Sequence, residues 1–111
     1  FLGLNAFASG GILNPNLDVN EVRASHVLVK TRKEAVQIKK QIENGDITFE
    51  DAARQYSLCP SGQYGGDLGY FNRKQMVQQF ADTAFDLKVG EISDPVGTKF
   101  GWHIIKTTAK R

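Results

Sequence analysis

The stretch FEDAARQYSLCPSGQYGGDLGYF, residues 49–71, passes from a helical pattern through a glycine-rich loop into a strand. Its first part has apolar residues at i, i+3, i+4 and i+7, the spacing of one helical face: Phe49, Ala52, Ala53 and Tyr56. Thr48 precedes this run as an N-cap. Residues 58–66 contain one proline and three glycines, so we expect no regular element there. Leu68–Phe71 is then a short strand.

Toward the N-terminus, residues 22–29 (VRASHVLV) are rich in β-formers and predict a strand. Thr31 and Glu34 follow with the spacing of a capping box, which indicates the start of a helix. Gly45 can end this helix in the left-handed conformation. The apolar residues of the helix share one face: Ala35, Ile38 and Ile42.

Toward the C-terminus, a second strong helical face is predicted from Val77, Phe80, Ala81, Ala84 and Phe85. Residues 87–90 form a turn. Residues 92–96 are expected to be a short strand, and Pro95 within it favours the edge of a sheet. Residues 97–101 then link it to a last strand over residues 102–108.

The resulting order is β-α-α-β-α-β-β, which predicts an α+β domain with an antiparallel sheet. The chain has 111 residues, enough for one modest core. We expect residues 1–20 to be a flexible leader and residues 21–111 to be the domain. The run Ala6–Ala8 is similar to the end of a signal peptide, although a linker accounts for it better, and the compartment stays open. The net charge of +2 is spread along the chain, which gives little support for nucleic-acid binding.

Four polar residues are candidates for chemistry: His26, Cys59, Thr98 and His103. A lone histidine in a strand is usually structural, and a lone cysteine is usually a small buried hydrophobe. The two histidines fall on the first and last strands, however, and such strands often pair. The pair is therefore more suggestive of a functional role than either histidine alone.

Three other chemistries receive little support from the sequence. Metal ligands are present (His26, His103, Cys59 and Asp67), but they lack the close spacing of structural zinc sites. A cysteine hydrolase needs a thiolate beside a histidine, yet Cys59 precedes Pro60 in a loop with no sign of a helix N-terminus. Residues 62–66 (GQYGG) lack the lysine and hydroxyl residue of a phosphate-binding loop.

Five stretches together resemble the parvulin family, in its order and spacing: ASHVLVK (24–30), FEDAARQYSLCPSGQYGGDLGYF (49–71), QMVQQFADTAF (75–85), LKVGEISDPV (87–96) and TKFGWHIIK (98–106). The resemblance implies a four-stranded antiparallel sheet flanked by about four helices, of the FKBP-like superfold. It also implies isomerisation of the peptide bond before proline, without a cofactor or metal. The expected partners are proline-containing polypeptides, and we expect a monomer that binds no nucleic acid and does not insert in a membrane.

The resemblance also implies the roles of individual residues. His26 and His103 match a facing pair in the central strands, Cys59 matches the active-site cysteine, and Thr98 matches a hydroxyl in their hydrogen-bond network. The pocket for the proline ring would be formed by Leu68, Met76, Phe80 and Phe100. Met76 and Phe80 are four residues apart, which predicts a shared helix face, and from pattern alone that face would simply be core.

The sequence departs from the phosphate-dependent branch of that family. Lys30 runs directly into the first helix through residues 31–33, so the long basic loop of that branch is missing. Phe100 is at a position that is aromatic in small bacterial members and serine in the phosphate-dependent ones. We therefore predict a folding helper with no phosphorylation requirement. The alternative is a peptide-binding chaperone module with little isomerase activity.

Overall fold

The computed structural model describes residues 19–111, so residues 1–18 of the expected leader lie outside the described residues. The order of elements is the predicted one, with a short 3₁₀-helix added after the second helix. In chain order the elements are β1 (Val22–Val29), α1 (Arg32–Glu43), α2 (Phe49–Tyr56), η1 (Pro60–Tyr64), β2 (Asp67–Phe71), α3 (Gln78–Asp86), β3 (Val96–Thr98) and β4 (Gly101–Lys110).

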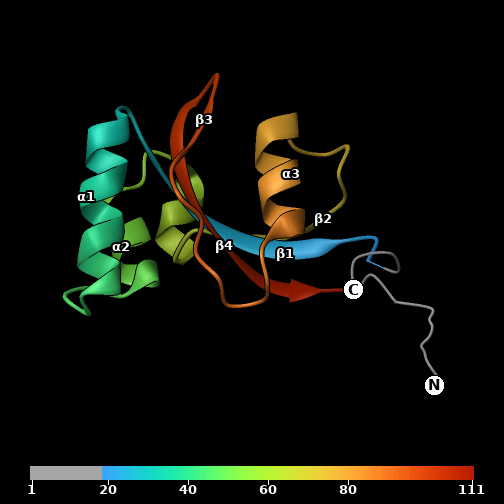
Figure 1. The fold of residues 1–111 in the computed structure, drawn as a ribbon, viewed down its shortest axis with the longest axis horizontal. Coiled ribbons are helices and arrows are strands. Elements are labelled where there is room, and N and C mark those ends of the chain that lie inside the picture. The colour runs from blue at the N-terminus through green and yellow to red at the C-terminus, as the bar shows by residue number, and fades with distance from the viewer. Residues whose placement is uncertain (1–18) are drawn as a thin grey trace.

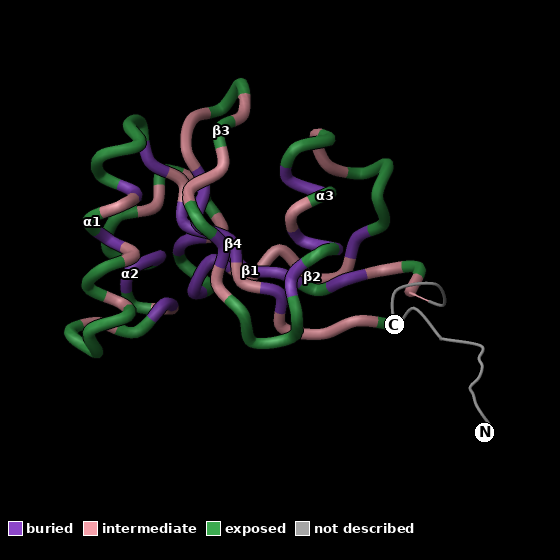
Figure 2. The backbone as a smooth tube through the Cα atoms, viewed as in Figure 1, coloured by how far each residue is buried: buried purple, intermediate pink, exposed green. Residues whose placement is uncertain are grey.

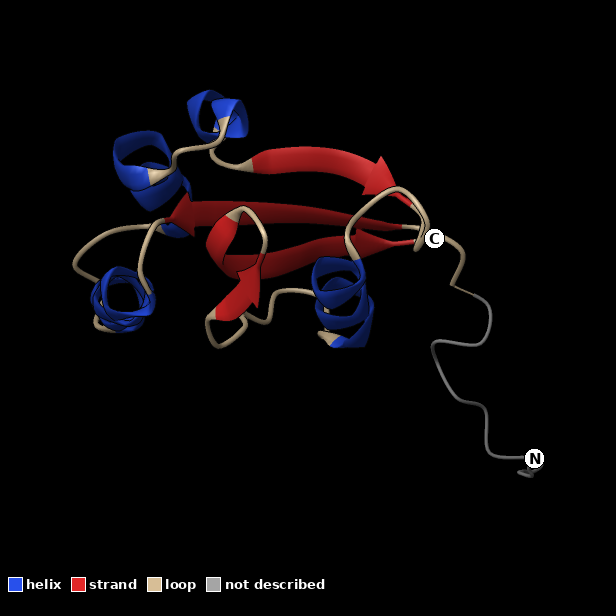
Figure 3. Ribbon diagram, turned by 90° about the horizontal axis from the view of Figure 1, so that it is seen from above, coloured by secondary structure: helices blue, strands red, loops and turns tan. Residues whose placement is uncertain are grey.

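The strands form one antiparallel sheet in the order β2-β1-β4-β3 (Figures 1 and 3). The first and last strands therefore pair at its centre, as predicted. Their register places His26 opposite Ile105 and Leu28 opposite His103. His26 and His103 are therefore diagonal neighbours on adjacent strands: each lies two residues away from the residue directly opposite the other.

Helices cover the two faces of the sheet unequally. One apolar cluster joins α3 to the face that carries His26, and its buried members are Val22, Ala24, Phe71, Phe80, Ala84, Phe85, Leu87 and Ile105. The other joins α1 and α2 to the opposite face, with Val27, Val29, Ala35, Ile38, Phe49, Ala52, Ala53 and Ile104 buried. Figure 2 shows the buried central strands between the outward, exposed faces of α1 and α3. The single helix α3 leaves part of its face of the sheet uncovered.

The predicted helix ends are confirmed. The Thr31 hydroxyl accepts a hydrogen bond from the Glu34 backbone N–H and donates one to the Glu34 carboxylate. Thr48 accepts from the Asp51 N–H in the same manner. At the C-terminus of α1, Gly45 has φ +80°, in the left-handed region that glycine tolerates.

The third strand was predicted too early in the chain. It spans Val96–Thr98 rather than residues 92–96. Before Pro95 the contact with β4 is an isolated bridge between Ile92 and Lys106, flanked by a hydrogen bond from the Ser93 N–H to the Ile105 carbonyl. Pro95 explains the shift, because a residue without an N–H cannot donate to the ladder. The strand does lie at the edge of the sheet, and the expected link over residues 97–101 is shortened to a tight turn at residues 99–100.

Three smaller expectations were also wrong. Residues 58–66 do contain a regular element, the 3₁₀-helix η1, which begins at Pro60 because the fixed φ of proline suits the first position of a helix. Met76 lies before α3, whose N-cap is Val77. Tyr56, counted on the apolar face, is 38% exposed at the last position of α2, where its hydroxyl accepts a hydrogen bond from the Gln55 side-chain amide. None of the helices in residues 19–111 is long and apolar enough to cross a bilayer.

Candidate active site

The uncovered part of the sheet carries a chain of three polar side chains from three strands. The Nδ1 atoms of His26 and His103 are 2.9 Å apart, so one ring donates a hydrogen bond to the other. The Nε2 atom of His103 is 2.7 Å from the Thr98 hydroxyl. That hydroxyl also accepts the Phe100 backbone N–H at 3.2 Å. The structure thus brings His26, His103 and Thr98 together as a continuous network.

This network allows two proton arrangements when both imidazoles are neutral. If His103 donates through Nδ1, its Nε2 accepts the Thr98 hydroxyl proton, and His26 carries its own proton on Nε2. If His26 donates through Nδ1, His103 donates to Thr98, and His26 Nε2 is a bare acceptor. This Nε2 is buried and has no hydrogen-bond partner among the described residues. The network therefore ends at an atom that can become either a donor or an acceptor.

Both histidines are held neutral at physiological pH. Burial lowers the pKa of His26 to about 4, with a smaller contribution from the nearby charge of His103. Burial also lowers the pKa of His103 to about 4. The ring of Phe80 meets each imidazole edge-on, with centroids 5.4 Å from His26 and 5.2 Å from His103. An apolar ring against both imidazoles excludes water, which disfavours the imidazolium form.

The Cys59 loop is fastened to β1 beside this network. The Ser57 hydroxyl accepts hydrogen bonds from the backbone N–H groups of Leu28, at 3.1 Å, and Cys59, at 3.3 Å. The Ser61 hydroxyl donates to the Cys59 sulfur at 3.2 Å. Cys59 also caps η1, so the helix N-terminus that the sequence did not reveal is present. No hydrogen bond joins the thiol to a histidine among the described residues, so the arrangement of a cysteine hydrolase is not formed.

A cavity of about 520 Å³ opens over the two histidines. Of the eight residues expected at the site, seven line it, and Thr98 lies behind His103: His26, Cys59, Leu68, Met76, Phe80, Phe100 and His103. Five further residues line it that the sequence reasoning missed: Leu28, Leu58, Pro60, Gln75 and Val77. Leu28 could have been found, because alternate residues of a strand share a face and it lies two residues after His26.

The alternatives weighed from the sequence do not form sites. Asp67 pairs with Arg23 through two hydrogen bonds, of 2.6 and 3.1 Å, instead of joining the histidines. Within residues 19–111, no group of three or more His, Cys, Asp or Glu side chains is placed to hold a metal ion. The glycine loop packs against β1, where the Gly66 carbonyl accepts the His26 backbone N–H. The N–H groups of Gly65 and Gly66, which could otherwise donate to a phosphate, bond carbonyls within the loop.

Comparison with known proteins agrees with this geometry. A model of the rotamase family, described as the PPIC-type PPIase domain, matches residues 18–109. Foldase protein PrsA of Geobacillus sp. (strain WCH70) is 50% identical over 91 residues, which make up 81% of this chain and 33% of that protein. Foldase protein PrsA of Bacillus subtilis (strain 168) is 48% identical over 92 residues, 82% of this chain and 31% of that protein. The chain thus spans about a third of these relatives.

Solved structures show the same likeness. The crystal structure of PrsA from Bacillus anthracis superposes with a TM-score of 0.81 at 46% identity, covering 84% of this chain and 43% of that one. The solution structure of NmPin, the parvuline of Nitrosopumilus maritimus, superposes with a TM-score of 0.73 at 40% identity, covering 81% of this chain and 97% of that one. The chain therefore belongs to the parvulin family of PPIC-type peptidyl-prolyl cis-trans isomerase domains.

Proposed function

We propose that this domain accelerates rotation about X-Pro bonds in unfolded or extended polypeptides, and that it assists folding without requiring a phosphorylated substrate. One observation carries the proposal: an apolar cavity is closed at its base by two neutral, hydrogen-bonded histidines. Leu68, Met76 and Phe80 offer a surface for a proline ring, and Phe100 is 61% exposed at the rim, where a bound chain would cover it.

Such a cavity suits the chemistry because rotation requires the amide to lose its resonance. The barrier of an ordinary peptide bond is ~18–20 kcal/mol, and uncatalysed X-Pro rotation takes tens to hundreds of seconds. The twisted amide has less charge separation than the planar one, so a dry site favours it over either planar form. Lowering the barrier by about 5 kcal/mol accelerates rotation by roughly 10³ to 10⁴.

The polar network would act on the amide without forming a covalent bond. His26 Nε2 is buried, so the network would act by fixing which nitrogen of each imidazole carries the proton beneath the cavity, and that choice is relayed from Thr98 through His103. Cys59 would lie near the substrate carbonyl as a polarisable neighbour. Isomerisation breaks only the partial double bond, so no acyl intermediate is needed.

Independence from phosphate rests on the entry to α1. Only Lys30 and Thr31 separate the end of β1 from Arg32, the first residue of α1. A cluster of arginines that could hold a phosphate bidentately therefore has no loop to carry it. The bulk of Phe100 at the rim also favours an uncharged residue before proline.

A protease-coupled assay tests the proposal with peptides that carry Leu, Glu or phosphoserine before proline. We expect acceleration with Leu at least equal to that with phosphoserine. A strong preference for phosphoserine would contradict the claim of phosphate independence. Folded protein that binds the peptides without any rate above background would support the alternative, a peptide-binding module with little isomerase activity.

A further inference from the structure

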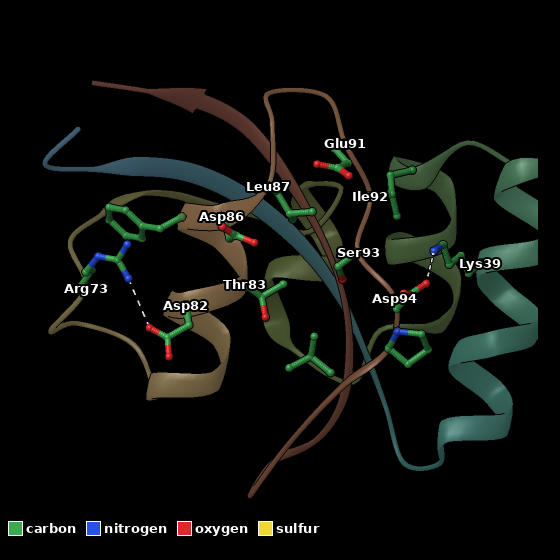
Figure 4. Close-up of a pocket in the computed structure, with 13 residues that line it drawn as sticks. Lys39, Arg73, Asp82, Thr83, Asp86, Leu87, Glu91, Ile92, Ser93 and Asp94 are labelled. Carbon is green, nitrogen blue, oxygen red and sulfur yellow. Dashed lines mark hydrogen bonds and ion pairs between the residues drawn. The ribbon is translucent and has the colours of Figure 1, made fainter. Parts of the chain in front are cut away.

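A second cavity, of about 800 Å³, lies between α3 and the segment that leads into β3 (Figure 4). Its apolar residues include Phe85, Leu87, Ile92 and Val96, of which Phe85 and Leu87 belong to the buried core. None of the residues that line it also lines the cavity over the histidines. We call this second cavity the α3 groove.

The α3 groove is acidic in a chain that is basic overall. Four carboxylates and two basic side chains line it, whereas the whole chain has a net charge of +2. Arg73 pairs with Asp82 at 3.3 Å, and Lys39 pairs with Asp94 at 2.7 Å (Figure 4). The two remaining carboxylates, Asp86 and Glu91, are exposed and form no ion pair with any residue in the described part of the chain. The local charge therefore complements a cation.

The α3 groove ends at Val96, the first residue of β3. Val96 lines the groove, and Thr98, two residues further on the same strand, bonds His103. Alternate residues of a strand share a face, so these two side chains lie on one side of β3. The helix α3 packs against β3 and contributes residues of its first half to one cavity and of its second half to the other. Val96 lies directly opposite His103, and Glu91 is five residues before Val96, at most about 16 Å away along an extended chain.

We propose that the α3 groove binds a basic side chain of the same polypeptide whose proline occupies the cavity over His26 and His103. An extended client would follow β3 and present Lys or Arg to Asp86 and Glu91, about four to six residues from its proline. The aliphatic stem of that side chain would cover the apolar floor of the groove while its charged head meets the carboxylates. This inference rests on the proposed function and adds to it a class of preferred substrate.

Isomerisation of matched peptides tests this inference. One series has Arg, Gln or Glu placed five residues before or after a common Leu-Pro unit, and a short peptide contains the Leu-Pro unit alone. At low ionic strength we expect kcat/KM for one Arg placement to exceed that of its Gln partner by about threefold to tenfold, which two partly exposed charge pairs can supply. The Glu peptide should be the poorest, and about 0.5 M salt should remove the difference.

Variants of the groove carboxylates test whether the preference for Arg arises in the α3 groove. The double variant Asp86→Asn/Glu91→Gln should lose the preference for Arg while turning over the short peptide at the wild-type rate. Asp46→Asn is the matched control, because Asp46 is exposed in the turn after α1 and does not line the groove. It should keep the preference. Equal kcat/KM for Arg and Gln peptides at both placements would overturn the inference, as would a preference that survives in Asp86→Asn/Glu91→Gln. Absence of turnover with every peptide would instead overturn the proposed function.

Discussion

The hydroxyl of Ser57 connects the Cys59 loop to the central strand that carries His26. It accepts two backbone N–H groups, those of Leu28 and Cys59. We predict that Ser57→Ala lowers the free energy of unfolding by about 1–2 kcal/mol, because a part-buried N–H loses its acceptor. It should also lower kcat/KM, since Cys59 would be held less firmly at the cavity, although the Leu58 N–H still bonds the Leu28 carbonyl. Urea unfolding and X-Pro turnover measure the two effects.

Ser61→Ala is the matched comparison for Ser57. It removes the hydrogen bond to the Cys59 sulfur but leaves the backbone of the loop attached to β1. We expect it to cost less stability than Ser57→Ala. If the two variants were equally stable and equally active, Ser57 would have no positioning role. Ser57→Thr keeps the hydroxyl and should restore part of the activity.

Met76 is a sharper probe of the proposed proline pocket than Phe80. Phe80 is 3% exposed and packs on Phe71 and both histidines, so its removal would leave a cavity in the core. Met76 is only partly buried and lies outside α3. We predict that Met76→Ala raises KM for X-Pro peptides severalfold while Tm falls by a few degrees. Steady-state kinetics and thermal melting check this. An unchanged KM would remove Met76 from the pocket.

At the scale of single residues, the sequence predicts best those functional residues whose side-chain type itself indicates a chemical role. The first and last strands carry His26 and His103 and do pair, and the family resemblance implied that the two side chains face each other. Ser57 carried no such signal, because its role depends on a backbone N–H from a strand 29 residues away in sequence. Leu58 was missed because its loop was expected to have no regular form, whereas its backbone N–H bonds the Leu28 carbonyl of β1 and so places it beside the cavity.

At the scale of elements, the junction of β1 with the glycine loop sets the position of His26. The Gly66 carbonyl accepts the His26 N–H, and a Cβ on Gly66 would come within 2.3 Å of the His26 carbonyl oxygen. Gly69 also has positive φ, yet a Cβ there would meet nothing within 4 Å. We predict that Gly69→Ala costs about 1 kcal/mol through its backbone conformation alone, whereas Gly66→Ala costs several times more or prevents folding.

Chemical denaturation of the two variants separates steric exclusion from backbone strain. Similar losses of stability for Gly66→Ala and Gly69→Ala would show that the loop can move away from β1.

The glycine loop was predictable as a turn, but its contact with β1 was not, because turn residues indicate local backbone conformation and not the segment that the turn packs against. The early placement of β3 failed for a related reason: hydrophobicity marked residues 92–96, and Ser93 does bond β4, but the regular ladder with β4 begins only after Pro95.

At the scale of the whole molecule, the buried histidine pair couples folding to pH. Each histidine has a pKa of about 4 in the folded state, whereas an exposed histidine in the unfolded chain titrates near 6.5. Between these values the unfolded chain binds protons that the folded domain does not. The free energy of unfolding therefore decreases as pH falls from about 6.5 to about 4. The chain contains only these two histidines, so the loss in this window is assigned to them.

The ion-paired carboxylates change the free energy of unfolding at lower pH than the histidines do, so they do not hide the contribution of the histidines. The hydrogen bond from Arg23 lowers the pKa of Asp67, and the hydrogen bond from Lys39 lowers that of Asp94, so the stability they contribute is lost only as pH falls below the ordinary aspartate range.

We therefore predict that the urea midpoint is constant from pH 8 to about 7 and then falls. The free energy of unfolding should fall with it, by at most about 2.7 kcal/mol per pH unit for two protons. The variant His26→Gln/His103→Gln should lose this slope because amides do not titrate. If that variant does not fold, ¹⁵N spectra of the wild-type imidazoles at pH 6 decide the matter: neutral rings support the prediction, and imidazolium signals contradict it. A wild-type midpoint that is unchanged at pH 5 would likewise show that the pair is hydrated, and the dry cavity on which the proposed catalysis depends would then be absent.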